Sequence, residues 1–226
     1  MSGYLSQAGF VCGMQSEAVI LRRALRSAIN PLRILCSGPG QSKAREAALE
    51  LAERGCTILI SAGIAGGLDP TLDAGDLVVA EHVCMPGRDA WICDPDITGW
   101  LAERTGALHR GGLWSVPDPV TGTEAKAALA SQGWLAVDME SGSVADVATE
   151  KGFRFACLRV IADTAGDSIP PVALKGLDES GNRRIWPVLA GLMRSPGQLG
   201  AMLALGRRSQ AAHARLLGAA LAISDG

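Results

Sequence analysis

Short runs of apolar residues recur along the chain, and a glycine-rich or polar break follows most of them. Runs of this length without polar alternation are typical of strands that are buried on both faces of a sheet. The strands predicted in this way cover residues 9–13, 33–36, 57–62, 76–82, 134–138 and 155–162.

Several segments between these runs carry apolar residues at the three- and four-residue spacing of a helix. Ser16, Ser42 and Thr123 are suited to cap three such helices, because their hydroxyls can accept a hydrogen bond from a free backbone N–H. A fourth helix is predicted from about Ser141 to Gly152. The alternation predicts an α/β fold, a single domain over residues 1–226 with a central mixed β-sheet flanked by helices.

Residues 177–226 are predicted to form an apolar helical C-terminal segment of that domain. Two interpretations stay open. The segment could form amphipathic helices that close the core. Alternatively, Pro187, Pro196, Gly197 and Gly200 break it into short pieces that suit a lid or an interfacial patch, with arginines able to meet anionic lipid head groups.

Composition narrows the class of protein. The chain has 226 residues, of which 48% are hydrophobic and 19% charged, enough for one domain with a sizeable core. A net charge of −2 without basic clusters argues against nucleic acid as a partner. The six cysteines form no CxxC pair and no metal-ligand spacing, so we expect reduced thiols and no metal. No secretory signal and no uncharged segment of roughly 18 residues is present, which predicts a cytoplasmic protein.

Two acidic residues stand where apolar runs end. Glu140 follows the run that closes with Asp138 and Met139, and Asp163 follows the run 155–162. Strands of an α/β sheet release their side chains into a ligand crevice at their carboxyl ends. A carboxylate there can bind hydroxyls, or it can donate a proton if burial raises its pKa. In isolation the same residues would be interpreted as a helix-terminal Glu and a helix-capping Asp.

Two glycine-rich stretches follow predicted strands. Residues 61–67 lack the GxGxxG spacing of a dinucleotide loop, which disfavours a Rossmann cofactor site. Their glycines either allow a tight turn or let a flat ligand lie against the main chain. Residues 37–40 are either an anion-binding nest at a helix start or a plain strand-to-helix turn.

Taken in order, six segments resemble one superfamily, that of the purine nucleoside phosphorylases and the methylthioadenosine/S-adenosylhomocysteine nucleosidases. The segments are residues 13–17, 37–40, 61–68, 75–78, 137–140 and 159–163. The resemblance covers roughly residues 9–167 and implies a nucleoside phosphorylase-like fold that breaks the bond between a purine and its ribose. Residues 177–181 and 187–192 resemble the hopanoid-associated phosphorylases, which implies release of adenine from adenosylhopane.

The resemblance also implies roles for particular residues. Asp163 matches the acid that protonates the purine at N7, and Glu140 matches the carboxylate that binds the ribose hydroxyls. Glu17 matches the residue that orients the attacking water, and Arg159 the arginine that holds this Glu. The further residues implied for substrate binding are Met139, Asp138, Ile64, Ala65, Gly66 and Val120, and those implied for a phosphate or water loop are Ser37, Gly38 and Gly40.

Several positions depart from the pattern of the superfamily. Pro117, Pro119 and Val120 stand where the nucleosidases place a phenylalanine, which implies weaker stacking of the base. Ser61 stands in place of a phosphate-binding arginine, Ile64 in place of a phosphate-binding serine, and Ala162 in place of a serine beside the acid. Hydrolysis and phosphorolysis therefore both stay open. With Ala162 unable to orient Asp163, we expect Thr164 or backbone amides to do so.

The resemblance implies no metal or organic cofactor, with phosphate as an optional co-substrate. Its partners are an adenine nucleoside, expected to be lipid-linked, and further copies of the chain in a homo-oligomer. Peripheral contact with the inner face of the membrane is an alternative to a purely cytoplasmic location. The alternative functions are a methylthioadenosine/S-adenosylhomocysteine-type nucleosidase and a catalytically silent nucleoside-binding protein.

Overall fold

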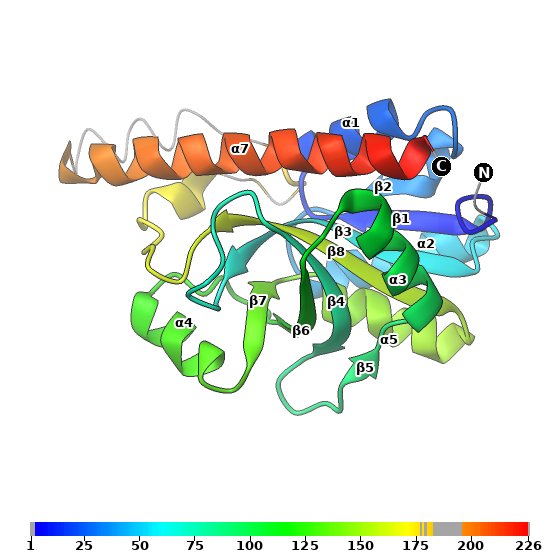
Figure 1. The fold of residues 1–226 in the computed structure, drawn as a ribbon, viewed down its shortest axis with the longest axis horizontal. Helices are drawn as coiled ribbons and strands as arrows, with labels where there is room; N and C mark the ends of the chain where they lie inside the picture. The colour runs from blue at the N-terminus through cyan, green and yellow to red at the C-terminus, as the bar shows by residue number, and fades with distance from the viewer. Residues whose placement is uncertain (1–2, 177, 179, 183–195, 226) are drawn as a thin grey trace.

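A mixed eight-stranded sheet forms the centre of the computed structural model, which describes residues 3–176, 178, 180–182 and 196–225 (Figure 1). Within this part of the chain the strand order is β2-β1-β3-β7-β6-β4-β5, and β8 pairs with both β3 and β4. The predicted α/β fold with a mixed sheet is confirmed. The strands are β1 (Ala8–Cys12), β2 (Ile34–Cys36), β3 (Ile58–Gly67), β4 (Leu77–Cys84), β5 (Trp91–Ile92), β6 (His109–Ser115), β7 (Trp134–Asp138) and β8 (Arg154–Asp163).

The sheet closes on itself through its two longest strands, β3 and β8. They run parallel to each other, β8 also pairs antiparallel with β4, and β3 pairs antiparallel with β7. At the closure Gly66 is in register with both Val137 and Asp163. The ends of β7 and β8, which carry the predicted acidic residues, therefore lie on either side of one glycine.

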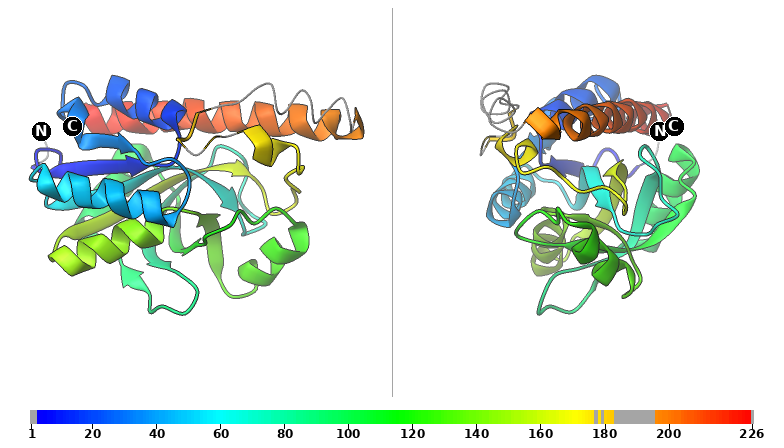
Figure 2. Two further views of the ribbon diagram at one scale, coloured as in Figure 1. Left: turned by 180° about the vertical axis from the view of Figure 1, so that it is seen from behind. Right: turned by 90° about the vertical axis from the view of Figure 1, so that its left-hand side faces the viewer.

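Helices cover the sheet in two layers. One layer consists of α1 (Gln15–Ala24), α3 (Pro95–Thr105) and α7 (Leu199–Ser224), and the other of α2 (Gln41–Glu53) and α5 (Ser141–Lys151), which lie side by side (Figures 1 and 2). Each layer buries its own apolar cluster against the sheet, which explains why β1, β3 and β8 read as continuous apolar runs. The short helix α4 (Thr123–Ala130) packs near β7, outside both layers.

The pair α3 and β6 was not predicted from the sequence. Asp94 accepts hydrogen bonds from the backbone N–H groups of Asp96 and Ile97, both at 3.1 Å, and Pro95 occupies the first turn of α3. The helix ends at Gly106 in the left-handed conformation, with φ at 65°. These capping signals were present in the sequence, but the apolar pattern between them is interrupted by polar residues.

The three predicted helix caps are wrong. Met14, Gly40 and Gly122 occupy the cap positions of α1, α2 and α4, so each hydroxyl residue expected to be a cap lies inside its helix. Ser16 instead lies 2.9 Å from His213 on α7, between its Oγ and the ring Nε2. That contact joins two helices that are neighbours only in the folded chain.

Two glycine-containing segments also differ from prediction. Residues 63–67 continue β3 as a strand and do not form a loop. In the tail, α7 is one continuous helix in which Gly200 makes no break. Its second half buries Ala212, Leu216 and Ile223 in the core, which favours the core-closing interpretation for this part of the tail. The predicted breaker Pro187 and the motif 187–192 lie outside the described residues.

Candidate active site

Asp163 ends β8 as a buried carboxylate, and its partner is Lys126 on α4. The Lys126 ammonium is fully buried, pairs with Asp163 Oδ2 and donates a second hydrogen bond of 2.7 Å to the carbonyl of Thr164. Burial raises the pKa of Asp163 above its ordinary value, and the charge of Lys126 opposes that rise. The expectation that the Thr164 side chain orients Asp163 is wrong, because its hydroxyl donates to Asp167.

Glu140 is the N-cap residue of α5 and is also buried. Its Oε1 accepts a hydrogen bond of 3.2 Å from the Gly40 N–H, and its Oε2 accepts one of 3.3 Å from the Met139 N–H. Burial raises the pKa of Glu140 to about 7, with a further contribution from the negative charge of Asp138. Glu140 can therefore change its charge near neutral pH.

Glu17 lies in the first turn of α1 and is held by two backbone amides. Its Oε2 accepts from the Met14 N–H and its Oε1 from the Ile64 N–H, both at 2.8 Å. Burial raises the pKa of Glu17, while the Ile64 amide and the charge of Arg159 lower it. The carboxylate thus caps its own helix and at the same time faces the backbone of β3.

Arg159 makes its ion pair with Asp138, and its charge also lowers the pKa of Glu17, the residue that the resemblance implies it holds. Both side chains are almost fully buried, and Arg159 Nη2 also donates to the hydroxyls of Ser61 at 2.6 Å and Ser141 at 2.8 Å. Asp138, expected to bind substrate, is engaged by Arg159 and the Ser141 hydroxyl. This cluster ties the end of β7 to the middle of β8, where Arg159 lies.

Glycines on β3 allow these side chains to approach its backbone. A Cβ at Gly63 would lie 2.7 Å from Glu17 Oε1 and 2.8 Å from Arg159 Nη1, and one at Gly66 would lie 3.2 Å from Asp163 Oδ2. Glu17 and Asp163 therefore meet the strand at positions three residues apart, about 10 Å along it. Glu17 and Asp163 thus lie along the same strand, at one end of the closed sheet.

The loop 37–40 belongs to this edge through Gly40. Gly38 and Gly40 have φ values of 80° and 106°, which glycine adopts readily, and the Gly40 amide is the one that faces Glu140. Ser37 Oγ donates to the Cys12 carbonyl at 3.3 Å. If residues 37–40 form an anion-binding nest, the Gly40 amide is one of its donors. In this structure that amide contacts the Glu140 carboxylate.

Apolar residues cover the side of Asp163 that faces β7. Val120 packs with Val116, Val137 and Leu68, and Trp114 and Trp134 join them with ring centroids 4.8 Å apart. Ile64 packs in the layer of α1, whereas Ala65 points into the layer of α5.

The C-terminal segment contacts the site at its other end. Gln15 N–H donates to the Gly181 carbonyl at 3.1 Å, and the Cys36 Sγ lies 3.7 Å from the Ser180 carbonyl. Gly181 adopts a φ of 75°, and a Cβ there would come within 2.5 Å of the Gly13 carbonyl. A Cβ at Gly13 would in turn lie 2.8 Å from Glu140 Oε1, so this segment borders the Glu140 side of the site. Leu177 and Glu179 of the same motif lie outside the described residues.

The helix α7 is tied to the Asp163 loop. Asp167 Oδ2 accepts hydrogen bonds of 2.8 Å from both the N–H and the hydroxyl of Thr164. Its Oδ1 pairs with Arg208 on α7 at 2.7 Å. The position of the residue next to Asp163 therefore depends on the last helix.

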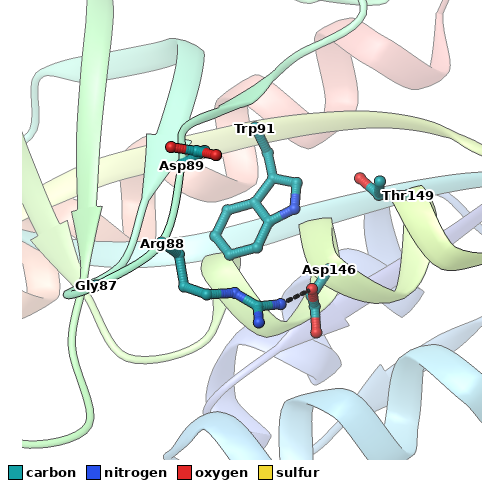
Figure 3. Close-up of a pocket in the computed structure, with 6 residues that line it drawn as sticks. All are labelled: Gly87, Arg88, Asp89, Trp91, Asp146 and Thr149. Atoms are coloured by element: carbon teal, nitrogen blue, oxygen red, sulfur yellow. Dashed lines mark hydrogen bonds and ion pairs between the residues drawn. The ribbon is translucent and has the colours of Figure 1, made fainter.

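A separate surface hollow is lined by Gly87, Arg88, Asp89, Trp91, Asp146 and Thr149 (Figure 3). The Arg88 guanidinium lies over the Trp91 ring, 5.6 Å from its centroid, and pairs with Asp146 (Figure 3). Because Arg88 is paired with Asp146 and the hollow contains none of the predicted site residues, we do not assign it to the substrate. Among the described residues, no group of three His, Cys, Asp or Glu side chains is arranged to hold a metal ion.

The family profile described as the Phosphorylase superfamily matches residues 22–179, which include the ends of β3, β7 and β8 and all the site residues except Glu17. The chain belongs to the phosphorylase superfamily. In this superfamily member, sequence reasoning found both acidic strand ends but missed Lys126. In the sequence Lys126 appears only as a lysine in a short alanine-rich helix, where a lysine is ordinarily exposed, so nothing there pointed to the site.

Among curated proteins, the superfamily member is 32% identical over 130 residues to the futalosine hydrolase of Streptomyces coelicolor. The match covers 48% of this chain, which spans about half (54%) of the length of that relative.

Solved structures share the fold. The methylthioadenosine/S-adenosylhomocysteine nucleosidase of Neisseria meningitidis, in complex with methylthio-immucillin-A, has a TM-score of 0.70 at 18% identity, over 97% of this chain and 99% of that one. The futalosine hydrolase of Helicobacter pylori has a TM-score of 0.63 at 19% identity, over 70% and 88% of the two chains. At these identities the likeness shows the fold alone.

Proposed function

We propose that the chain is a nucleosidase that cleaves the N-glycosidic bond of a purine nucleoside with water. The observation that carries the proposal is the convergence of three buried carboxylates, Glu17, Glu140 and Asp163, at the closed end of one sheet. Breaking the bond places positive charge on the sugar and negative charge on the purine. Carboxylates near the sugar and an acid near the base match both changes.

Each carboxylate has a distinct task in this scheme. Asp163, whose pKa is raised by burial, donates a proton to the purine as the bond breaks. Glu140 accepts hydrogen bonds from the ribose hydroxyls, and Glu17 orients the water and takes its proton. The apolar cluster around Val120 excludes water from the base side.

The charges around the site favour water over phosphate as the nucleophile. Arg159 is already paired with Asp138, Ser61 hydrogen-bonds to that arginine, and the Gly40 amide faces Glu140. A phosphate dianion would meet Glu17 and Glu140 without an unpaired cation among the described residues of this region.

We further propose adenosylhopane as the nucleoside. Its hopane skeleton needs an apolar path away from the site, and α7 offers Leu199 and Leu203, which are 50% and 56% exposed. Leu203 lies five residues from Arg208, about 7.5 Å along the helix, and Arg208 is tied to the Asp163 loop. The second candidate is a small nucleoside such as methylthioadenosine, which the nucleosidase-like fold suggests.

Base release from adenosylhopane, methylthioadenosine, S-adenosylhomocysteine and futalosine, followed by chromatography, tests the choice of substrate. We expect adenosylhopane to have the highest kcat/KM. The double variant Leu199→Ser/Leu203→Ser should lower kcat/KM for adenosylhopane about 30-fold and leave that for methylthioadenosine unchanged, since about 2 kcal/mol of apolar contact is lost.

Leu221→Ser is the matched control, because Leu221 is exposed on the same helix at its far end. If the unaltered protein preferred methylthioadenosine, the small nucleoside would take the place of adenosylhopane as the proposed substrate. Deletion of residues after about Ser195 is unsuitable as a test, because it removes the core residues Leu216 and Ile223.

Glu140 gives a prediction for pH dependence. Its pKa is raised to about 7, so the ionised form that binds hydroxyls most strongly is lost as pH falls through 7. We expect the KM for ribonucleosides to rise by up to about tenfold per pH unit below that point. Glu140→Gln should remove this dependence and reduce the discrimination against 2′- and 3′-deoxy analogues, measured as a ratio of kcat/KM values. Unchanged discrimination in the variant would exclude Glu140 from ribose binding.

A further inference from the structure

Lys126 is a charged side chain with no exposed surface, placed directly against the acid of the proposed reaction. Its ammonium contacts Asp163 Oδ2 and the Thr164 carbonyl, which leaves one donor of three. Burying an ammonium is costly, and most lysines of a short helix lie in solvent. The contact therefore needs an explanation beyond the packing of α4.

We propose that Lys126 is a positioning residue that shares one proton with Asp163 and thereby keeps Asp163 able to act as an acid at neutral and alkaline pH. This inference rests on the proposed function. In a buried pair, the ionic form and the neutral form made of an amine and a carboxylic acid become close in energy. One proton can then occupy either partner.

Every proton in the proposed step comes from, and returns to, a named group or the solvent. The Lys126 ammonium passes a proton to the Asp163 carboxylate, which gives an amine and a carboxylic acid. Asp163 passes that proton to the purine as the electron pair of the C–N bond moves onto the base. Water adds to the sugar cation and loses a proton to Glu17, and proton exchange with solvent then restores both Lys126 and Glu17.

The other groups that face Asp163 leave Lys126 as its principal charged partner. Asp167, on the loop after β8, raises the pKa of Asp163 and Arg208 on α7 lowers it, but these two are paired with each other. From β3 and β7 the neighbours of Asp163 are Gly66 and Val137, which carry no charge.

The test compares kcat for methylthioadenosine between pH 5.5 and 9.5 in the unaltered protein, Lys126→Met and Lys126→Arg. Without Lys126, Asp163 is a single buried carboxyl whose acid form declines about tenfold per pH unit above its pKa. We expect Lys126→Met to lie within about threefold of the unaltered protein at pH 5.5, and to be about 100-fold slower at pH 9 with little change in KM. Lys126→Arg keeps the positive charge but cannot give up a proton, so it should also lose activity as pH rises. Lys151→Met, on exposed α5 surface, should match the unaltered protein.

A loss in Lys126→Met that is equal at every pH, or no loss, would overturn the inference.

Carbon NMR of the Asp163 carboxyl provides a readout without turnover, with Asp163→Asn for assignment. In the unaltered protein the carboxyl should show a second titration step at alkaline pH, where the shared proton leaves the pair, whereas Lys126→Met should show a single step. Absence of the second step in the unaltered protein would also overturn the inference. Absence of base release by the unaltered protein would instead contradict the proposed function. Lys126→Gln replaces Lys126→Met if the latter does not fold.

Discussion

Replacing Asp163 with asparagine is expected to lower kcat by about 10²–10⁴-fold while nucleoside binding changes little. Asparagine keeps the size of the side chain, and its carbonyl oxygen can still accept the hydrogen bond from Lys126. It cannot hand a proton to the purine. Base release at saturating nucleoside measures the loss, and calorimetric titration with a non-cleaved nucleoside analogue measures binding.

Asp146→Asn is the matched control for this substitution. Asp146 is also ion-paired, with Arg45 and Arg88, but it lies on α5 away from the three carboxylates. We expect the control to retain its kcat within about twofold. Turnover close to normal in Asp163→Asn would remove Asp163 from the role of general acid.

Arg159→Met is expected to lower the free energy of unfolding by about 3–5 kcal/mol, the usual cost of breaking a buried ion pair. The substitution removes the cation that faces Asp138, Glu17 and Glu140, all of which are buried. Burial already raises the pKa values of Glu17 and Glu140, and without Arg159 these two carboxyls would hold protons still more tightly in the folded state than in the unfolded state. By linkage, the destabilisation grows as pH rises above the unfolded pKa values near 4. Urea unfolding at pH 5.5 and pH 8 should show the larger loss at pH 8.

Arg154→Met supplies the comparison on the same strand. Arg154 begins β8 and pairs with Asp94 and Asp96, but its side chain is 39% exposed. Such a pair contributes about 1 kcal/mol or less. If Arg159→Met were no more destabilising than Arg154→Met, the buried cluster would not hold β7 and β8 together as described.

The sequence predicted the parts of the site that depend on strand ends. Glu140 and Asp163 each follow a continuous apolar run, and such runs form β7 and β8, whose ends flank Gly66. Six of the eight strands and four of the helices follow from the same patterns, whereas β5 and β6 do not. The helix α3 was missed because its signals lie in capping residues, while its apolar pattern is interrupted.

The partners of the charged residues could not be predicted from local patterns. Lys126 is 37 residues away from Asp163 in sequence, and a lysine between alanines looks like any exposed helix position. Arg159 on β8 was assigned to Glu17 by resemblance, and its ion pair with Asp138 at the end of β7 was not predicted. Which charges pair in a buried cluster depends on the closure of the sheet, and that closure is a long-range property.

Product analysis tests the central claim most directly. The unaltered protein is incubated with methylthioadenosine and with adenosylhopane, in buffers with and without phosphate, and the sugar product is identified by mass spectrometry. We expect free adenine and a free reducing sugar from at least adenosylhopane, at the same rate in both buffers. Release that requires phosphate and yields a sugar 1-phosphate, or no release from either nucleoside, would contradict the account.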